Sequence, residues 1–433
     1  MNKNKHINYN IDKESIYDVI IIGGGASGMM AGCVASGIGK KVLIIEKNLE
    51  LGSKLKISGG GRCNITNATY NIHDLLEKYG ESKKILYSPF SIFGIKDTFD
   101  FFENLKLPLV VQAENRAFPY TEKALDVYNA MLNNLIKNNV QIKTKSKVLK
   151  IVKNENNTDV IDYVIVKENN LTKKYYGSSF ILSTGGLSHP ETGSTGDGFS
   201  WLRDLGHSII NPTPNIVPLI TKEKWSHIIS GVSVDNAKIT FYADGVKKFS
   251  KIGRILFTHF GLSGPTILNS SIQVSDLFYS SDFITAKIDC YPGIDESLLD
   301  QNILKILDLN KNKVLKNVIK EIIPQGLLKG IEVLLFDSVD LNIKTHSLSK
   351  DNRKKITRLL KELPLTIRGL EGFDKSVVAD GGVPLSEIDT KTMRSKYIKN
   401  LCITGDLLNV RRPTGGYSLQ LCWTTGYIAG KSV

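Results

Sequence analysis

The chain has 433 residues, of which 41% are hydrophobic and 23% charged, and it carries a formal net charge of +13. This length predicts two or three domains with cores of their own, and the composition is ordinary for a soluble globular protein. The sequence contains no stretch of about 20 apolar residues, so no membrane-spanning helix is expected.

Two explanations of the positive charge stay open. The excess could serve a polyanionic partner such as RNA. It could also reflect a composition rich in lysine and asparagine, because lysine far outnumbers arginine and is spread thinly along the chain.

The first 16 residues are polar and lack the apolar core of a signal peptide, so we expect a flexible tail at 1–16 and a cytoplasmic protein. The cysteines are scattered and form no CxxC pair, so neither a disulfide framework nor a metal site is expected. Their odd number fits a reducing compartment. They are Cys33, Cys63, Cys290, Cys402 and Cys422.

The segment 17–47 predicts a strand, a glycine turn, a helix and a second strand. Its buried apolar run is typical of a parallel strand. The following G-x-G-x-x-G has one glycine for the tight turn, one for the approach of a pyrophosphate and one for close packing of the helix. These glycines are Gly23, Gly25 and Gly28.

Glu46 ends the second strand, 21 residues after Gly25. A carboxylate at this distance binds ribose hydroxyls, so the segment predicts a dinucleotide site. A glycine turn that only packs a helix against a sheet would leave Glu46 without a role. The acid argues against a ribose 2′-phosphate and hence against NADP here, but it does not separate NAD from FAD.

The stretch ISGGGRCNITN at 57–67 follows this unit. Three consecutive glycines weaken helices and strands. The stretch is therefore either a flexible connector or a place where the backbone comes very close to a ligand.

The next segments predict helices over 72–106, a helix capped by Thr121 and ending near Lys137, and short strands over 141–176. The buried strand FILSTGG at 180–186 ends on two glycines, which favours a ligand at its carboxyl end. A glycine-rich loop then leads into a helix that begins near Gly196 or Asp197.

The pattern changes near residue 208. Short alternating strands over 208–292 predict a small antiparallel barrel or sandwich. Apolar positions repeat at three and four residues over 295–363, which predicts helices. After about residue 377 a buried strand, LCITGD, and a helix of small residues return, so we expect the two chain ends to meet in one nucleotide-binding domain.

Five motifs occur in order: GGGASG, GSKLKISGGGRCNITN, LSTGGLSHPETGSTGDG, FTHFGLSGP and PTGGYSLQ. On these motifs the chain resembles the BaiN/RdsA-type family of bacterial FAD-dependent oxidoreductases, also described as aminoacetone-oxidase-like flavoproteins. The resemblance extends from about Tyr17 to Ala429.

The resemblance implies an α/β fold with a Rossmann-like FAD-binding domain formed by both chain ends, and an inserted β-barrel with a helical subdomain. The expected boundaries are a tail at 1–16, the first part of the FAD-binding domain at 17–207, the barrel at 208–294, the helical subdomain at 295–363, and the C-terminal part of the FAD-binding domain at 364–433.

The implied function is hydride transfer through flavin N5, most simply to an activated C=C bond of a small molecule. The alternatives are an RNA-modifying flavoenzyme that makes dihydrouridine in ribosomal RNA, an amine oxidase, and a non-catalytic flavin-binding protein. No second G-x-G-x-x-G is present, so NAD(P)H would act as a transient reductant. The oligomeric state is not assigned.

The fingerprint and the resemblance together predict AMP near 23–28 and the flavin ring near 58–64 and the TGGYSLQ segment. The predicted cofactor-binding residues are Gly23, Gly25, Ala26, Ser27, Gly28, Glu46, Lys47, Lys54, Ser58, Gly59, Gly60, Arg62, Cys63, Asn64, Val148, Thr184, Gly185, Gly186, Gly405, Asp406, Gly416, Tyr417, Ser418, Leu419 and Gln420.

Cys63 and His259 are the candidate catalytic residues, since reduction of a polarised C=C bond needs a proton as well as a hydride. The alternatives are a small buried residue for Cys63 and a structural histidine for His259. Arg62 holds the cofactor or forms an ion pair, and Asn64 bonds the flavin or fixes its loop.

Arg411 and Arg412 depart from the family pattern, in which this position often has small or acidic residues. They predict either an anionic substrate or pairing with nearby acids and solvent. Asp406 is expected to hold the ribityl chain or pyrophosphate, with a helix N-cap as the alternative.

Overall fold

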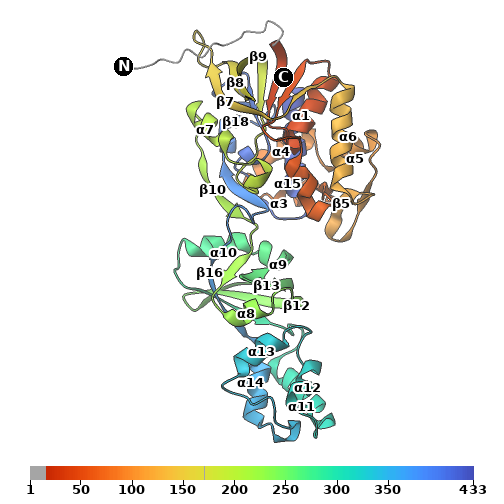
Figure 1. The fold of residues 1–433 in the computed structure, drawn as a ribbon, viewed down its shortest axis with the longest axis vertical. Coiled ribbons are helices and arrows are strands. Elements are labelled where there is room, and N and C mark those ends of the chain that lie inside the picture. The colour runs from red at the N-terminus through yellow and green to blue at the C-terminus, as the bar shows by residue number, and fades with distance from the viewer. Residues whose placement is uncertain (1–15, 170) are drawn as a thin grey trace. The chain divides into compact units, whose positions relative to one another are not determined.

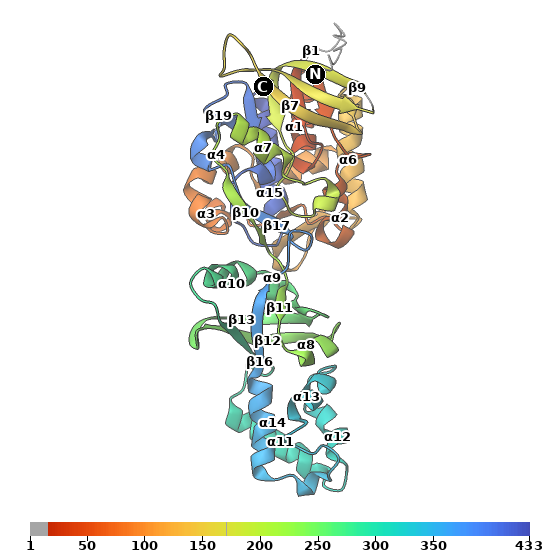
Figure 2. The same cartoon turned by 60° about the vertical axis from the view of Figure 1, so that its left-hand side comes forward.

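The computed structural model describes residues 16–169 and 171–433, so the predicted tail lies outside the described residues except for Ile16. The chain divides into two compact units (Figures 1 and 2). Of the described residues, those from 16 to 214 and from 377 to 433 form unit 1, and those from 215 to 376 form unit 2.

Unit 1 is built on a nine-stranded sheet whose central strands are parallel, in the order β20, β9, β1, β2, β6. Their apolar runs are buried, as in sheets covered on both faces. β18 and β19 extend one edge, and β7 and β8 pair antiparallel beside β9. The strands are β1 (Ile16–Ile22), β2 (Val42–Ile45), β6 (Gln141–Lys143), β7 (Ser146–Lys153), β8 (Ile161–Glu168), β9 (Leu171–Leu182), β18 (Ile388–Asp389), β19 (Arg394–Ser395) and β20 (Leu401–Ile403).

Helices α1 (Ala26–Gly37) and α15 (Tyr417–Lys431) join the two chain ends. A Cβ at Gly426 would lie 2.4 Å from the carbonyl oxygen of Ser27, and one at Gly430 would lie 2.5 Å from that of Ala31. Only glycine permits this close approach. The prediction that both chain ends form one Rossmann-like domain is confirmed.

The segments between β2 and β10 surround the site described below. They include α2 (Ser53–Ile57), η1 (Ser58–Gly61), β3 (Thr66–Asn67), α3 (Ile72–Glu77), α4 (Lys83–Ile92), α5 (Ile95–Asn104), β4 (Leu109–Val111), β5 (Arg116–Pro119), α6 (Ala124–Lys137) and α7 (Asp197–Asp204). The expected cap at Thr121 was wrong. The backbone of Glu122 is left-handed (φ 53°), so the chain is still turning there, and Lys123 is the N-cap of α6.

Unit 2 contains a closed barrel in the order β11, β14, β13, β12, β15, β16, of which Figure 2 labels β11, β12, β13 and β16. The strands are β11 (Leu219–Thr221), β12 (Ser233–Ala243), β13 (Val246–Phe257), β14 (Gly261–Ser263), β15 (Ile284–Asp289) and β16 (Leu363–Leu370). Between β15 and β16 the chain forms four α-helices, α11 (Glu296–Leu309), α12 (Leu315–Val318), α13 (Leu328–Leu335) and α14 (Lys350–Lys361).

The inserted unit therefore has other limits than the sequence predicted. β16 follows the helices and closes the barrel between β11 and β15, whereas residues after 363 were expected in the FAD-binding domain. Leu363, Leu365 and Ile367 alternate into the barrel core. At the other limit, β10 (Ile210–Asn215) pairs with β17 (Val378–Gly382) instead of starting the barrel.

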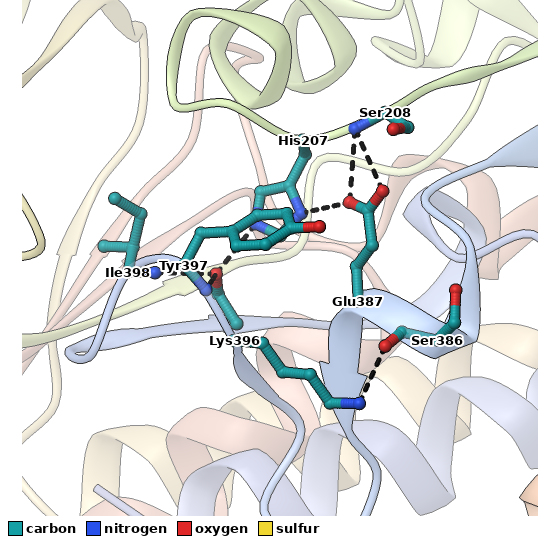
Figure 3. A network of polar contacts seen from close by, with 8 residues as sticks. His207, Ser208, Ser386, Glu387, Lys396, Tyr397 and Ile398 are labelled. Atoms are coloured by element: carbon teal, nitrogen blue, oxygen red, sulfur yellow. Dashed lines mark hydrogen bonds and ion pairs between the residues drawn. The ribbon is translucent and has the colours of Figure 1, made fainter.

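A buried polar network fixes the edge of the sheet in unit 1 (Figure 3). Nδ1 of His207 lies 2.8 Å from the Glu387 carboxylate, and Nε2 lies 2.8 Å from Oγ of Ser395. The same hydroxyl accepts the backbone N–H groups of Tyr397 and Ile398. Because Ser395 accepts twice, its proton is directed at Nε2, and Nδ1–H donates to Glu387. The network needs a neutral imidazole.

We expect acidification to destabilise the protein through this network. Burial lowers the pKa of His207, and Glu387 only partly offsets it. Burial would raise the pKa of Glu387, but hydrogen bonds from Ser208 and His207 outweigh it and lower the pKa. Below about pH 6.5 the unfolded chain takes up a proton that folded His207 resists, so the free energy of unfolding falls by at most about 1.4 kcal/mol per pH unit.

Melting temperatures of the wild type and of His207→Gln, measured from about pH 7 to about pH 5, check this expectation. The melting temperature of the wild type should fall more on acidification than that of the variant, because the glutamine does not titrate. Equal losses in both proteins would contradict the assignment.

Candidate functional site

The glycine turn after β1 has the geometry of a phosphate site. A Cβ at Gly28 would lie 2.0 Å from the carbonyl oxygen of Gly23, so close packing there requires glycine. Gly25 is the N-cap of α1, and a Cβ built on it would have no atom within 4 Å. Ala26 and Ser27 begin the helix. The N-terminus of α1 thus faces open space where an anion can approach its amides.

Glu46 lies at the end of β2, where the fingerprint predicts the ribose. Its Oε2 accepts the N–H of Gly24 at 2.8 Å and its Oε1 accepts the N–H of Asn48 at 2.8 Å. The carboxylate is held in one orientation while each oxygen keeps a further lone pair. It lines a hollow together with Ile22, Gly23, Ile45, Lys47, Ser146, Lys147, Val148, Thr184, Gly193, Asp197 and Trp201.

This hollow brings together five predicted residues: Gly23, Glu46, Lys47, Val148 and Thr184. Asp197 and Trp201, which lie in α7, also line the hollow and were not predicted from the sequence. The strand–glycine–helix pattern before α7 was the available signal, since such helices begin beside the ligand.

Lys47 belongs to the wall of the hollow. Its Nζ lies 2.7 Å from Oδ2 of Asp197 and 2.5 Å from Oγ1 of Thr195. Burial would raise the pKa of Asp197, but the hydrogen bond and charge of Lys47 outweigh burial and lower it. The pair ties the end of β2 to the start of α7.

Thr184 supplies a donor at the carboxyl end of β9. Its Oγ1 is buried and has no hydrogen-bond partner among the described residues. A buried hydroxyl without a partner is costly, so it favours a ligand oxygen here. Gly185 and Gly186 follow, and a Cβ at Gly186 would lie 3.2 Å from the carbonyl oxygen of Asp406. The open amide end of α1, the fixed carboxylate and this hydroxyl fit the AMP half of FAD.

The three glycines of the second motif form an ordered left-handed turn. Gly59, Gly60 and Gly61 have φ angles of 57°, 67° and 83°. A Cβ at Gly59 would lie 2.8 Å from the backbone nitrogen of Asn64, whereas Cβ atoms at the other two would meet nothing within 4 Å. The stretch is therefore not a flexible connector, and it leaves an open backbone surface suited to a planar ring.

Arg62 forms a structural ion pair. Its Nη1 lies 3.0 Å from Oε2 of Glu122, and its guanidinium lies 4.4 Å from the ring centroid of Phe118. It also donates to Gln112. These contacts support the ion-pair alternative for Arg62, and a role toward the cofactor stays a prediction.

Asn64 fixes the loop. In the amide orientation that satisfies its neighbours, its nitrogen lies 3.0 Å from the carbonyl oxygen of Thr66 and 3.2 Å from that of Ala117, and its oxygen accepts the N–H of Gly416 at 3.1 Å. The side chain thus joins the glycine turn to the start of α15.

Cys63 is fully buried, with a left-handed backbone (φ 59°). Burial raises the pKa of its thiol to about 12, so the group stays protonated at neutral pH. A side chain enclosed by the core favours the packing alternative over substrate contact.

Two further predicted residues lie on α2 and at its end. Lys54 is half-buried, and its Nζ donates to Oγ of Ser188 at 3.1 Å. Burial lowers the pKa of Lys54, with Asp406 the largest opposing influence. Ser58 donates to the carbonyl oxygen of Leu55 and so ends α2.

The C-terminal segment meets the first motif at Gly405, where a Cβ would lie 2.9 Å from Oγ of Ser27. Asp406 forms an ion pair with Arg412, and Arg411 lies 3.1 Å from Asp380. Of the two alternatives for the arginines, the structure favours pairing with acids. The N-cap alternative for Asp406 was wrong, because it lies within the short helix η8 (Gly405–Leu407).

The start of α15 contains the remaining predicted residues. Gly416 is the N-cap, and a Cβ there would lie 2.3 Å from the backbone of Thr66. Tyr417 is buried and Leu419 packs on the core. The prediction that Gln420 binds the cofactor is corrected. Its side chain is fully buried and bonded to threonines, so it supports the loop instead of contacting a cofactor.

His259, the second candidate catalytic residue, belongs to unit 2, whereas the groups described above belong to unit 1. His259 is exposed in unit 2, and its ring packs edge-on against Phe260. The helix after it begins at Pro265 with Gly264 as N-cap. In unit 1, Nδ1 of His189 lies 2.8 Å from Glu191.

Comparison with known proteins gives the relatives of the chain. The family described as HI0933-like protein Rossmann domain matches residues 17–432. The 3-dehydro-bile acid delta(4,6)-reductase of Clostridium scindens is 28% identical over 416 residues, covering 95% of this chain and 98% of the relative. The ribosomal RNA dihydrouridine synthase of Escherichia coli is 25% identical over 421 residues, covering 96% and 98%.

Solved structures share the fold. A flavocytochrome c3 fumarate reductase has a TM-score of 0.53 at 15% identity, covering 96% of this chain and 78% of that chain. The 3-ketosteroid-delta4-(5alpha)-dehydrogenase of Rhodococcus jostii has a TM-score of 0.53 at 13% identity, covering 99% and 98%. The predicted fold class is confirmed. No helix formed by residues 16–169 and 171–433 has both the length and the apolar character needed to span a bilayer.

Two glycine variants test the phosphate site. Gly25→Ala should keep the melting temperature of the apoprotein, because the methyl group enters open space, yet weaken FAD binding about tenfold or more by blocking the pyrophosphate. Gly28→Ala should destabilise the apoprotein by about 1–3 kcal/mol through its backbone clash. Thermal melts and FAD titration by fluorescence measure both effects.

Gly37→Ala, at the open end of α1, is the matched control and should bind FAD like the wild type. Unchanged FAD affinity in Gly25→Ala would overturn the placement of the pyrophosphate.

Proposed function

We propose that the chain, which belongs to the HI0933-like Rossmann family and is an FAD-dependent oxidoreductase, reduces a carbon–carbon double bond conjugated to a carbonyl group. The observation that supports this proposal most directly is the similarity to a delta(4,6)-reductase over 95% of the chain. A 3-oxo steroid with such double bonds and a uracil ring share one feature, a C=C bond polarised by a carbonyl group. The proposal therefore fits the names of both groups of relatives.

The residues described above have separate tasks. Bound FAD would supply a hydride equivalent at N5, and the protein must hold, orient and shield the reactants. Glu46 and Thr184 hold the adenosine ribose, and Gly25 lets the pyrophosphate approach the amides of α1. The turn at 59–61 presents backbone to the ring edge. NAD(P)H is the proposed electron donor, docking transiently.

The first test follows the electrons. Anaerobically reduced holoprotein should be reoxidised by a 3-oxo-Δ4 steroid, and the product should carry two additional hydrogen atoms. The saturated 3-oxo steroid is the control and should not react. Absorbance of the flavin and mass spectrometry of the product measure this. A holoprotein that reoxidises with neither this steroid nor uridine-containing RNA would contradict the proposal.

Cys63 is proposed to fill space, as its burial supports. Cys63→Ala should retain FAD and keep turnover within about twofold, because no proton donor is lost. Cys63→Ser is the control for the effect of a polar group in this buried position. A loss of turnover of about a hundredfold or more in Cys63→Ala, with FAD still bound, would assign the thiol as the proton donor.

Reduction of uridine in ribosomal RNA is the second candidate, and the surface of the barrel favours it. Lys247, Lys248 and Lys251 are exposed on β13, and none of them takes part in an ion pair within the described part of the chain. Such a row can contact a phosphate backbone. A uridine would have to leave its stack to reach a flavin.

Basic side chains on the helices of unit 2 are paired with acids. Arg353 forms two hydrogen bonds of 2.9 Å with Asp300, and Lys361 lies 2.7 Å from Asp289. Lys316 lies 2.9 Å from Glu332. Much of their charge is locally compensated.

Mass spectrometry of ribosomal RNA from a deletion strain separates the two candidates. The steroid-type proposal predicts that dihydrouridine is unchanged. Loss of one dihydrouridine, restored by the wild type and not by a variant with Lys247, Lys248 and Lys251 changed to glutamine, would establish the RNA function.

A further inference from the structure

Arg412 is a buried cation in the loop between β20 and α15. Only 1% of the surface of Arg412 is exposed. The Nε group donates to Oγ of Ser418 at 2.9 Å, Nη1 donates to the carbonyl oxygen of Val410 at 2.6 Å, and Nη2 forms the ion pair with Asp406. A guanidinium is tolerated in such a place only when it is paired and hydrogen-bonded.

Its partners lie on two segments that the sequence predicts to bind the cofactor. Asp406 follows β20 beside Gly405, and Ser418 lies in the first turn of α15. The planar fork of arginine fixes both at once, which the point charge of a lysine cannot do. Arg412 therefore determines how the carboxylate and the start of the helix are placed.

The positive charge of Arg412 has a second role, which concerns the carboxylate of Asp406. A cation near the N-terminus of α15 is unfavourable toward the helix dipole, so helix stability does not explain it. It cancels the carboxylate charge of Asp406, whose surroundings also include Lys54 and, through Lys54, Glu191. An uncompensated carboxylate beside a bound flavin disfavours the reduced form, because reduction adds negative charge to the ring.

We propose that Arg412 is a positioning residue for FAD, which holds Asp406 and the start of α15 in place and keeps the midpoint potential of the bound flavin high by neutralising Asp406. This inference rests on the proposed function, because it takes FAD to be bound next to Asp406 and Gly416.

The test compares neighbouring arginines. In Arg412→Gln, the midpoint potential of bound FAD should fall by about 30 mV, the two-electron equivalent of a tenfold loss in preference for the reduced form. Arg411→Gln removes the same charge one residue away, from a side chain that is 54% exposed and pairs with Asp380. It should leave the potential unchanged. Dye-equilibration titration of the holoproteins measures the potential.

Two variants keep the inference testable if Arg412→Gln loses FAD. Arg412→Lys should keep the potential near that of the wild type and weaken FAD binding about tenfold, because charge remains and the fork is lost. Asp406→Asn combined with Arg412→Gln should restore the potential. A wild-type potential in Arg412→Gln, or a fall in Arg411→Gln of equal size, would overturn the inference.

Failure of the proposed function and failure of this inference would give different results. A wild-type protein that does not bind FAD would remove the proposed function. A wild-type protein that binds FAD and reduces its substrate, with potentials unaffected by Arg412, would remove only the present inference.

Discussion

Close contact between the backbones of α1 and α15 is the constraint on which the site depends. Gly426 and Gly430 are four residues apart and therefore lie on one face of α15, where they admit the backbone of α1. This contact brings the first glycine turn to Gly405, although almost the whole chain separates them. A side chain at either position would push the helices apart and separate the two halves of the cofactor site.

The glycine turn at 59–61 is held in place by neighbouring side chains. Asn64 and Gln420 bond to backbone and threonines around the glycine turn, and Arg62 is anchored on Phe118. A left-handed turn of three glycines loses much conformational entropy on ordering. These anchors keep it in place, so that its exposed backbone is ready for a ring without further rearrangement.

The sequence predicts what depends on local order. Gly23, Gly28 and Glu46 fall where the strand–turn–helix pattern requires, because each acts within a few residues of its own strand end. It cannot predict pairs fixed by tertiary packing. His207 meets Glu387 from 180 residues away. Strand β16, which closes the barrel, follows the helical segment, and the apolar pattern of the helices hides the alternating pattern of this strand. The partner of Arg412 lies only six residues away, yet the burial that makes the pair strong comes from other elements.

The topology of the barrel has a consequence for the history of such proteins. Its first and last strands, β11 and β16, are neighbours, with Leu219 opposite Leu370. The flanking strands β10 and β17 are likewise paired with each other in unit 1. In each unit the two strands next to the junction pair with each other, so unit 2 is an insertion whose two ends are adjacent. Recombination can exchange such an insertion without stretching the remaining chain, while unit 1 is inherited intact.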